Sequence, residues 1–221
     1  METNLTIKAS IVEAGCAMLA KGLVAGTWGN ISVRSEGGVA ITPSGSDYLT
    51  LTPSDIVTVD YNGITGEGQR VPSSEMPLHL AIYTARPDVG AIVHTHSIFA
   101  SACAVARRSI PPLIEDLVQM TGGGVEVAEY ALPGTKALAE NTVKALGDRQ
   151  AVLMANHGLV ACGRTLKEAM LIVVLVEKAA EIYVHSQALG GPQVLSEQDI
   201  QIMRQFYLEH YQKRQGGISC G

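Results

Sequence analysis

Apolar side chains recur at helical spacing near the start of the chain. Ile7, Ile11 and Met18 are separated by four and seven residues, which places them on one face of a helix. The pattern predicts an amphipathic helix over residues 5–23 that stops near Gly22.

Short apolar runs bounded by turn residues predict strands. The first two runs flank Gly37 and Gly38, a typical hairpin signal, and the third ends before a second signal at Asn62-Gly63. The expected strands cover residues 31–34, 39–42, 56–61, 89–94, 125–130, 151–154 and 159–162.

Five further segments predict helices. One of them contains a β-branched run, Ile172 to Val174, but its length and the charged residues on both sides favour a helix over a strand. Ser196 is the expected N-cap of the last helix. The expected helices cover residues 75–85, 98–107, 135–146, 166–185 and 196–214.

Helices and strands alternate along the chain, and no linker rich in proline or serine divides it. We therefore expect one α/β domain over residues 1–221, with a mixed or mainly antiparallel sheet and helices on its faces. Residues 216–221 are expected to form a frayed tail.

Charge and aromatic content exclude some classes of binding protein. The chain has a formal net charge of -5 with no run of like charge, and only 5% of its residues are aromatic. Nucleic-acid binding relies on clustered positive charge or on stacking side chains. We therefore expect no nucleic-acid partner.

The sequence predicts neither a membrane span nor a secretion signal. The longest strongly apolar run, residues 169–176, is far shorter than the roughly 20 residues of a span. Acidic Glu2 and Glu13 do not fit the basic and apolar regions of a signal peptide. We expect a cytoplasmic protein without a membrane partner, whose cysteines are reduced. These cysteines are Cys16, Cys103, Cys162 and Cys220.

Three histidines lie in positions that suit a metal ion. His94 and His96 end a strand-like run, where residues two apart point to the same side. His157 lies in a turn-like Asn-His-Gly between two apolar strands. Three imidazoles leave one position open on a tetrahedral ion, as in catalytic zinc sites. The alternative is that they are ordinary hydrogen-bonded or surface histidines, as we expect for His79 and His185.

The start of the helix at 75–85 also has two interpretations. In the first, it is an ordinary helix N-terminus: Ser74 caps the helix, and the helix dipole favours the negative charge of Glu75. The same hydroxyls and N–H groups suit a phosphate, and Glu75 suits a metal. Two other turns, around Thr27 and around Ser44, offer similar neutral donors, so together the turns predict an anion-binding nest without basic side chains.

Six short fragments occur in a specific order along the chain: GTWGNIS (26–32), ITPSG (41–45), LTPSDIV (51–57), PSSE (72–75), VHTHS (93–97) and NHGLVACG (156–163). In this order they resemble the class II aldolase/adducin family, over about residues 5–212. The resemblance implies an α/β/α sandwich and a homotetramer with its site near the subunit interface.

The resemblance also implies a lyase. The expected reaction is the reversible cleavage of a ketose 1-phosphate, of the fuculose 1-phosphate or 5-deoxypentulose 1-phosphate type, to dihydroxyacetone phosphate and an aldehyde. Zinc, with Mn²⁺ or Co²⁺ as possible substitutes, would be held by His94, His96, His157 and Glu75, and Glu75 would also be the catalytic acid/base. The phosphate would lie among Thr27, Asn30, Ser44, Gly45, Ser73 and Ser74.

The sequence departs from the family pattern at the proton donor. A tyrosine of the family aligns with Glu115, and a second one near the C-terminus aligns with His210 or Tyr211. These three residues are the candidates for protonating the leaving alkoxide, with Glu115 as a solvated loop charge being the alternative.

Other functions are built on the same fold. Epimerases that share this metal site carry an aspartate at a place that falls near Gln119, and a glutamine cannot exchange a proton, which disfavours an epimerase. A sugar-phosphate epimerase, decarboxylase or dehydratase stays the alternative to the aldolase. A non-catalytic interaction module of the adducin type is disfavoured, because Glu75 and all three histidines are present.

Overall fold

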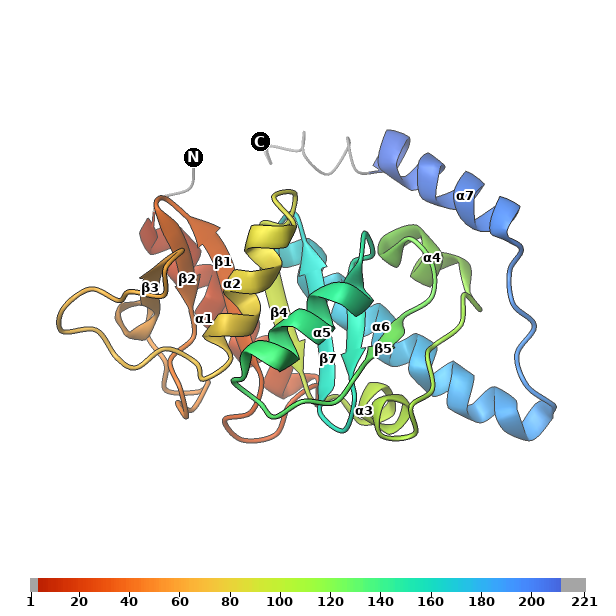
Figure 1. Cartoon of the computed structure of the whole chain (residues 1–221), viewed down its shortest axis with the longest axis horizontal. Coiled ribbons are helices and arrows are strands. Elements are labelled where there is room, and N and C mark those ends of the chain that lie inside the picture. Colours follow the sequence, from red (N-terminus) through yellow and green to blue (C-terminus); the bar gives the residue numbers. More distant parts are fainter. Residues whose placement is uncertain (1–3, 212–221) are drawn as a thin grey trace.

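A seven-stranded sheet forms the centre of the molecule, with strand order β3-β2-β1-β4-β7-β6-β5 (Figure 1). The computed structural model describes residues 4–211, and side chains through residue 210. The strands are β1 (Asn30–Ser35), β2 (Gly38–Ile41), β3 (Val57–Asp60), β4 (Ala91–Thr95), β5 (Glu126–Ala128), β6 (Ala151–Met154) and β7 (Gly158–Gly163).

Strand pairing is antiparallel throughout the sheet except between β5 and β6, which are parallel. The mixed, mainly antiparallel sheet expected from the sequence is therefore confirmed. The register puts Asn30 of β1 opposite His94 of β4, and Thr95 opposite Leu159 of β7. Residues far apart in sequence thus meet where the central strands β1, β4 and β7 have neighbouring ends.

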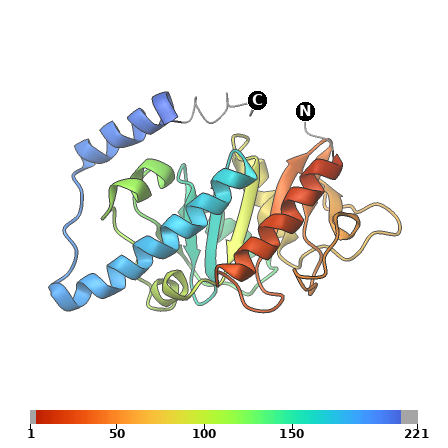
Figure 2. The same ribbon diagram turned by 180° about the vertical axis from the view of Figure 1, so that it is seen from behind.

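Helices cover both faces of the sheet. α2 and α5 lie on one face and α1 and α6 on the other, as Figures 1 and 2 show from opposite sides. The helices are α1 (Asn4–Ala20), α2 (Met76–Ala85), α3 (Ile98–Val105), α4 (Glu115–Thr121), α5 (Lys136–Leu146), α6 (Leu166–Ser186) and α7 (Glu197–Phe206).

Two apolar clusters fill the spaces between the three layers. One contains Ile11 and Met18 of α1 together with Ile172 and Val173 of α6. The other contains residues of α2 and α5, among them Leu78 and Ile82, against the opposite face of the sheet. The α/β/α sandwich that the resemblance implied is confirmed, because each sheet face is buried by its own pair of helices.

The structure corrects the sequence prediction at two helix starts. α4 was not predicted; it is short and begins at Glu115, for which a loop position was the alternative to a proton donor. Ser74 does not cap α2: the N-cap position belongs to Glu75, and no side chain caps it. Ser196 does cap α7, accepting the N–H of Asp199.

Three cysteines in the described part of the chain, Cys16, Cys103 and Cys162, are free thiols, as expected. Cys220 and the predicted tail at 216–221 lie outside the described residues. Among the described helices, none is both long enough and apolar enough to cross a membrane.

Candidate metal centre and substrate cavity

The fold brings the three predicted histidines together. His94 is the second-last residue of β4, His96 follows directly after the strand, and His157 lies in the turn between β6 and β7. Because β4 pairs with β7, this turn lies beside the end of β4. One ring nitrogen from each histidine lies within 4.8 Å of the others, and Nε2 of His94 is 2.8 Å from Nε2 of His96.

Glu75 joins this cluster from the start of α2. Its Oε2 lies 3.1 Å from Nε2 of His94, and its Oε1 lies 3.1 Å from Nε2 of His157. The carboxyl is buried, with only 5% of the residue exposed. Asn30 donates a hydrogen bond of 2.9 Å to Oε2. The two carboxylate oxygens therefore have different surroundings.

Backbone conformation at the β6–β7 turn aims His157 at the cluster. Asn156 has a left-handed φ of 54°, which asparagine adopts more readily than most residues. Gly158 follows, and a Cβ there would meet the carbonyl oxygen of Thr95 and approach the rings of His94 and His96 to 3.2 Å. The close approach of the turn to β4 thus requires glycine at position 158, and asparagine suits the left-handed position 156.

The ionisation states suit metal ligands. Burial and the neighbouring His94 lower the pKa of His96 and of His157 to about 4, so both imidazoles are neutral at pH 7. Burial raises the pKa of Glu75, but the imidazoles of His94 and His157 and the amide of Asn30 outweigh it and bring this pKa to about 2. Neutral imidazoles and an ionised carboxylate are the forms that bind a metal.

The donor set fits a tetrahedral divalent ion. Nδ1 of His94 donates to the carbonyl oxygen of Leu159 at 2.9 Å, which leaves a bare lone pair on Nε2 in the neutral ring. Ligands at about 2.0–2.1 Å from a tetrahedral zinc are about 3.3 Å from one another. The closest distances among His94, His96, His157 and Glu75 are 2.8–3.1 Å. A metal held by these four residues is therefore consistent with the fold.

A cavity of about 280 Å³ opens beside the cluster. It is lined by Glu75, His96 and His157, whereas His94 is fully buried beneath them. All six predicted phosphate-binding residues line the same cavity: Thr27, Asn30, Ser44, Gly45, Ser73 and Ser74. Candidate metal ligands and neutral anion donors therefore share one space.

The donors around this cavity differ in their other contacts. Ser44 N–H donates to Val71 and Ser73 N–H to Thr42, so these two backbone donors are already used. The Asn30 side chain contacts Glu75 through its nitrogen and His79 through its oxygen, leaving one amide hydrogen. Within the described part of the chain, no lysine or arginine lines the cavity.

Sequence reasoning missed two residues near the site. Trp28 lines the cavity, stacks on His96 with a centroid distance of 5.8 Å and is 64% exposed. Its signal was its place inside the GTWGN fragment. His79 is a hydrogen-bonded histidine, as expected, but sequence reasoning did not find that it is completely buried and bonded to Asn30. Its signal was the spacing of four residues from Glu75 along a helix.

The predicted proton donors do not line this cavity in the described chain. Glu115 is exposed at the start of α4, and His210 is exposed beside Phe206. The side chain of Tyr211 lies outside the described residues. α4 and α7 occupy the end of the molecule opposite the β6–β7 turn (Figures 1 and 2).

Comparison with known proteins agrees with this arrangement. Residues 9–184 match the family "Class II Aldolase and Adducin N-terminal domain". The chain is 40% identical over 193 residues to 5-deoxy-D-ribulose 1-phosphate aldolase of Bacillus thuringiensis, covering 86% of this chain and 90% of the relative. It is 39% identical over 204 residues to L-fuculose phosphate aldolase of Escherichia coli K12, covering 92% and 94%.

A solved structure shares the fold closely. The structure of an L-fuculose 1-phosphate aldolase superposes with a TM-score of 0.88 and 40% sequence identity, covering 91% of this chain and 96% of that one. The family match covers residues 9–184, which include the three histidines of the cluster, and the relative of Escherichia coli K12 covers 92% of the chain. The chain therefore belongs to the class II aldolase and adducin family.

Proposed function

We propose that the chain is a zinc-dependent aldolase that reversibly cleaves a ketose 1-phosphate to dihydroxyacetone phosphate and an aldehyde. One observation carries the proposal: Glu75, His96 and His157 of the candidate metal cluster line the same small cavity as a set of neutral donors that suit a phosphate. Relatives of about 40% identity, named as aldolases of 5-deoxyribulose 1-phosphate and fuculose phosphate, support the substrate class.

The phosphate end of the substrate would be bound by N–H and hydroxyl groups. The predicted phosphate-binding residues line the cavity that His96 and His157 also line: Thr27, Asn30, Ser44, Gly45, Ser73 and Ser74. Because these donors are fixed by turns and by the start of α2, they orient the phosphate with little loss of side-chain freedom. Binding energy from this non-reacting end positions the carbons that react.

The reaction breaks the bond between C3 and C4 of the ketose. The hydroxyl on C4 gives up its proton as the aldehyde forms, and the electron pair of the broken bond remains on C3. Bound zinc would act as a Lewis acid that stabilises this developing negative charge. His94, His96 and His157, with Glu75, would hold the ion.

Glu75 moves the proton at C3. The carboxylate is ionised at neutral pH and lines the cavity. In the direction of synthesis it takes a proton from C3 of dihydroxyacetone phosphate, and in the direction of cleavage it returns a proton to C3. Burial holds the carboxylate in one orientation, so its proton transfer has a defined direction.

A second group must exchange the proton on the C4 oxygen. Glu115, His210 and Tyr211 stay our candidates, and we infer that a neighbouring copy of the chain in a homotetramer brings one of them to the cavity. Light scattering tests the assembly, and a monomer with full activity would contradict it. A cytoplasmic location stays a prediction from the sequence.

A substrate panel tests the reaction class. Purified protein is incubated with fuculose 1-phosphate, 5-deoxyribulose 1-phosphate and ribulose 5-phosphate, and products are identified by NMR. We expect dihydroxyacetone phosphate and an aldehyde from at least one ketose 1-phosphate. An epimerised, decarboxylated or dehydrated product without dihydroxyacetone phosphate would replace the aldolase with one of those activities.

A further inference from the structure

A row of five buried polar side chains connects β1 with α2. Asn30 and Ser32 lie two apart on the strand, and Glu75, His79 and Tyr83 lie four apart along the helix. These spacings put each set on a single face. Tyr83 OH is 3.0 Å from Ser32 Oγ, Ser32 Oγ is 2.6 Å from His79 Nδ1, and His79 Nε2 is 2.6 Å from Asn30 Oδ1.

The carboxylate of Glu75, at one end of this row, fixes which group donates in each hydrogen bond of the row. The ionised Glu75 only accepts, so the Asn30 amide turns its nitrogen to Glu75 and its oxygen to His79. That oxygen also only accepts, so the proton of His79 is on Nε2. The other ring nitrogen, Nδ1, lies 2.6 Å from Ser32 Oγ, so a ring that carries its proton on Nε2 accepts there from the Ser32 hydroxyl.

All donors in the row therefore point toward Glu75. Burial raises the pKa of Tyr83, whose hydroxyl stays protonated and donates to Ser32. Hydrogen bonds aligned in one direction polarise one another, which strengthens the last bond in the row. The whole row is buried, and the side chains of Ser32 and His79 are completely so.

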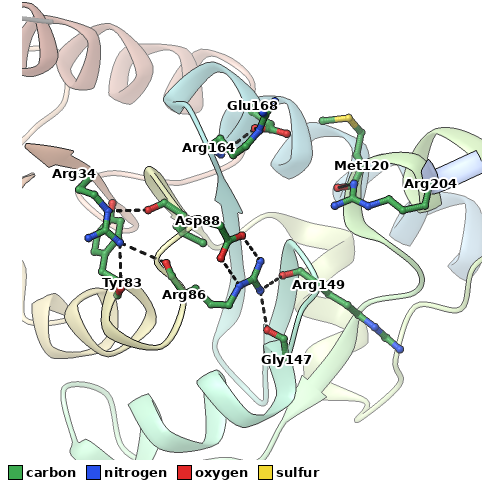
Figure 3. Close-up of polar contacts among 11 residues, drawn as sticks. Arg34, Tyr83, Arg86, Asp88, Met120, Gly147, Arg149, Arg164, Glu168 and Arg204 are labelled. Atoms are coloured by element: carbon green, nitrogen blue, oxygen red, sulfur yellow. Dashed lines mark hydrogen bonds and ion pairs between the residues drawn. The ribbon is translucent and has the colours of Figure 1, made fainter. Parts of the chain in front are cut away.

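The far end of the row is held by Arg34. Its guanidinium carbon lies 4.7 Å from the centroid of the Tyr83 ring, and Nη2 donates to the carbonyl of Tyr83 at 3.1 Å (Figure 3). Nη2 also reaches the carbonyl of Arg86, and Nε reaches that of Val89. Arg34 thus ties β1 to the end of α2, so the row is fixed at the end away from Glu75.

We propose that His79 is a positioning residue: through Asn30 it keeps an N–H on Oε2 of Glu75 and so leaves Oε1 as the oxygen that exchanges the substrate proton. The inference rests on the proposed function. Among the described residues, Oε1 is a buried oxygen that receives no hydrogen bond, and it faces His157. A freely rotating Asn30 would offer Glu75 either an N–H or a repelling carbonyl oxygen.

Two substitutions at His79 test the proposal. Glutamine keeps an N–H close to the position of Nε2, whereas leucine keeps the volume and removes the donor. We expect His79→Leu to lower kcat by ~10–100-fold with little change in KM, the range seen when a residue supporting a metal ligand is removed. His79→Gln should recover most of that loss. His185→Leu and His185→Gln, at an exposed histidine outside the row, serve as matched controls.

NMR of the imidazole nitrogens gives a readout independent of activity. In metal-free protein at pH 7, His79 should be protonated on Nε2 alone, with a slowly exchanging proton. Protonation on Nδ1 would overturn the proposal. If the tautomer is as expected but no ketose phosphate is cleaved, the row stands and the proposed function fails. If the enzyme is active and His79→Leu retains kcat, the function stands and the positioning role fails.

A milder variant covers the case in which His79→Leu does not fold. Ser32→Ala removes the donor to Nδ1 and leaves the ring in place. We expect faster exchange of the His79 proton and a lower kcat at unchanged KM. Unchanged proton exchange together with unchanged kcat would overturn the proposal.

Discussion

Glu75 occupies a position where one side chain contacts two imidazoles, an amide and the cavity at once. Its two oxygens are unequal, because Asn30 donates to Oε2 and no described group donates a hydrogen bond to Oε1. A carboxylate with one fixed and one available oxygen suits a group that holds a metal and also transfers a proton.

The first prediction separates these two tasks of Glu75. Glu75→Gln keeps the shape and an oxygen ligand but cannot carry the proton, so we expect bound zinc to persist while kcat falls by about 10²–10⁴-fold. Metal analysis and release of dihydroxyacetone phosphate measure the two effects. Full activity in this variant would show that Glu75 does not transfer the proton.

The second prediction concerns the buried ligand. His94 is fully buried and central to the cluster, with its Nδ1 already fixed by Leu159. His94→Ala should lose both stoichiometric zinc and turnover, whereas His185→Ala at an exposed position should keep both. Retention of zinc by the His94 variant would remove this residue from the ligand set.

Residue patterns predicted part of the candidate site because spacing along a strand determines which side chains point to the same side. The His-x-His pair spans the end of β4, and its two nitrogens meet as period-two alternation requires. His79 could not be recognised in this way. Its partners Asn30 and Ser32 are more than forty residues away in sequence, and only the packing of α2 on β1 brings them together.

At the scale of elements, the site depends on how closely the β6–β7 turn approaches β4. Gly158 makes that approach possible, because a Cβ would meet the Thr95 carbonyl and the rings of His94 and His96. The pairing of β4 with β7 and the positions of the three histidines therefore both depend on this turn.

The third prediction tests this dependence. Gly158→Ala should lower the free energy of unfolding by about 1–3 kcal/mol, as overpacking does, and should also weaken zinc binding. Gly66→Ala is the matched control, because its Cβ would meet only the end of the flexible Gln69 side chain. Denaturant unfolding and zinc titration of both variants provide the measurements. Equal behaviour of the two variants would contradict the account.

Helices were predictable from the sequence where they were long and had a periodic apolar face. They were less predictable where tertiary contacts determine whether a segment is helical. α1 and α6 agree with their patterns because each repeats an apolar face over several turns. α4 has only seven residues, and its buried Leu117 and Val118 become a helical face only through contact with α6 and α7. No local pattern of that length separates such a helix from a loop.

At the scale of the whole molecule, three histidines whose pKa is lowered by burial link folding to pH. His79, His96 and His157 have pKa values of about 3, 4 and 4 in the folded chain, below the value near 6.5 expected when unfolded. The unfolded state therefore binds more protons as the pH falls below about 6.5, and stability declines with it. Glu75, whose pKa is also lowered, adds to this decline below about pH 4.5.

The fourth prediction follows from that linkage. Metal-free protein should lose stability steadily between pH 6.5 and about pH 4, measured by denaturant unfolding at each pH. His79→Gln should show a shallower decline, because one of the three titrating groups is removed. A free energy of unfolding that is independent of pH over this range would contradict the burial of neutral histidines.

Metal dependence of the cleavage reaction tests whether the chain is a metal-dependent aldolase. Release of dihydroxyacetone phosphate from a ketose 1-phosphate is measured in protein freed of metal and then titrated with zinc. We expect no activity without metal and a rise that saturates at one zinc per chain. Undiminished cleavage by protein shown to contain no metal would contradict this expectation.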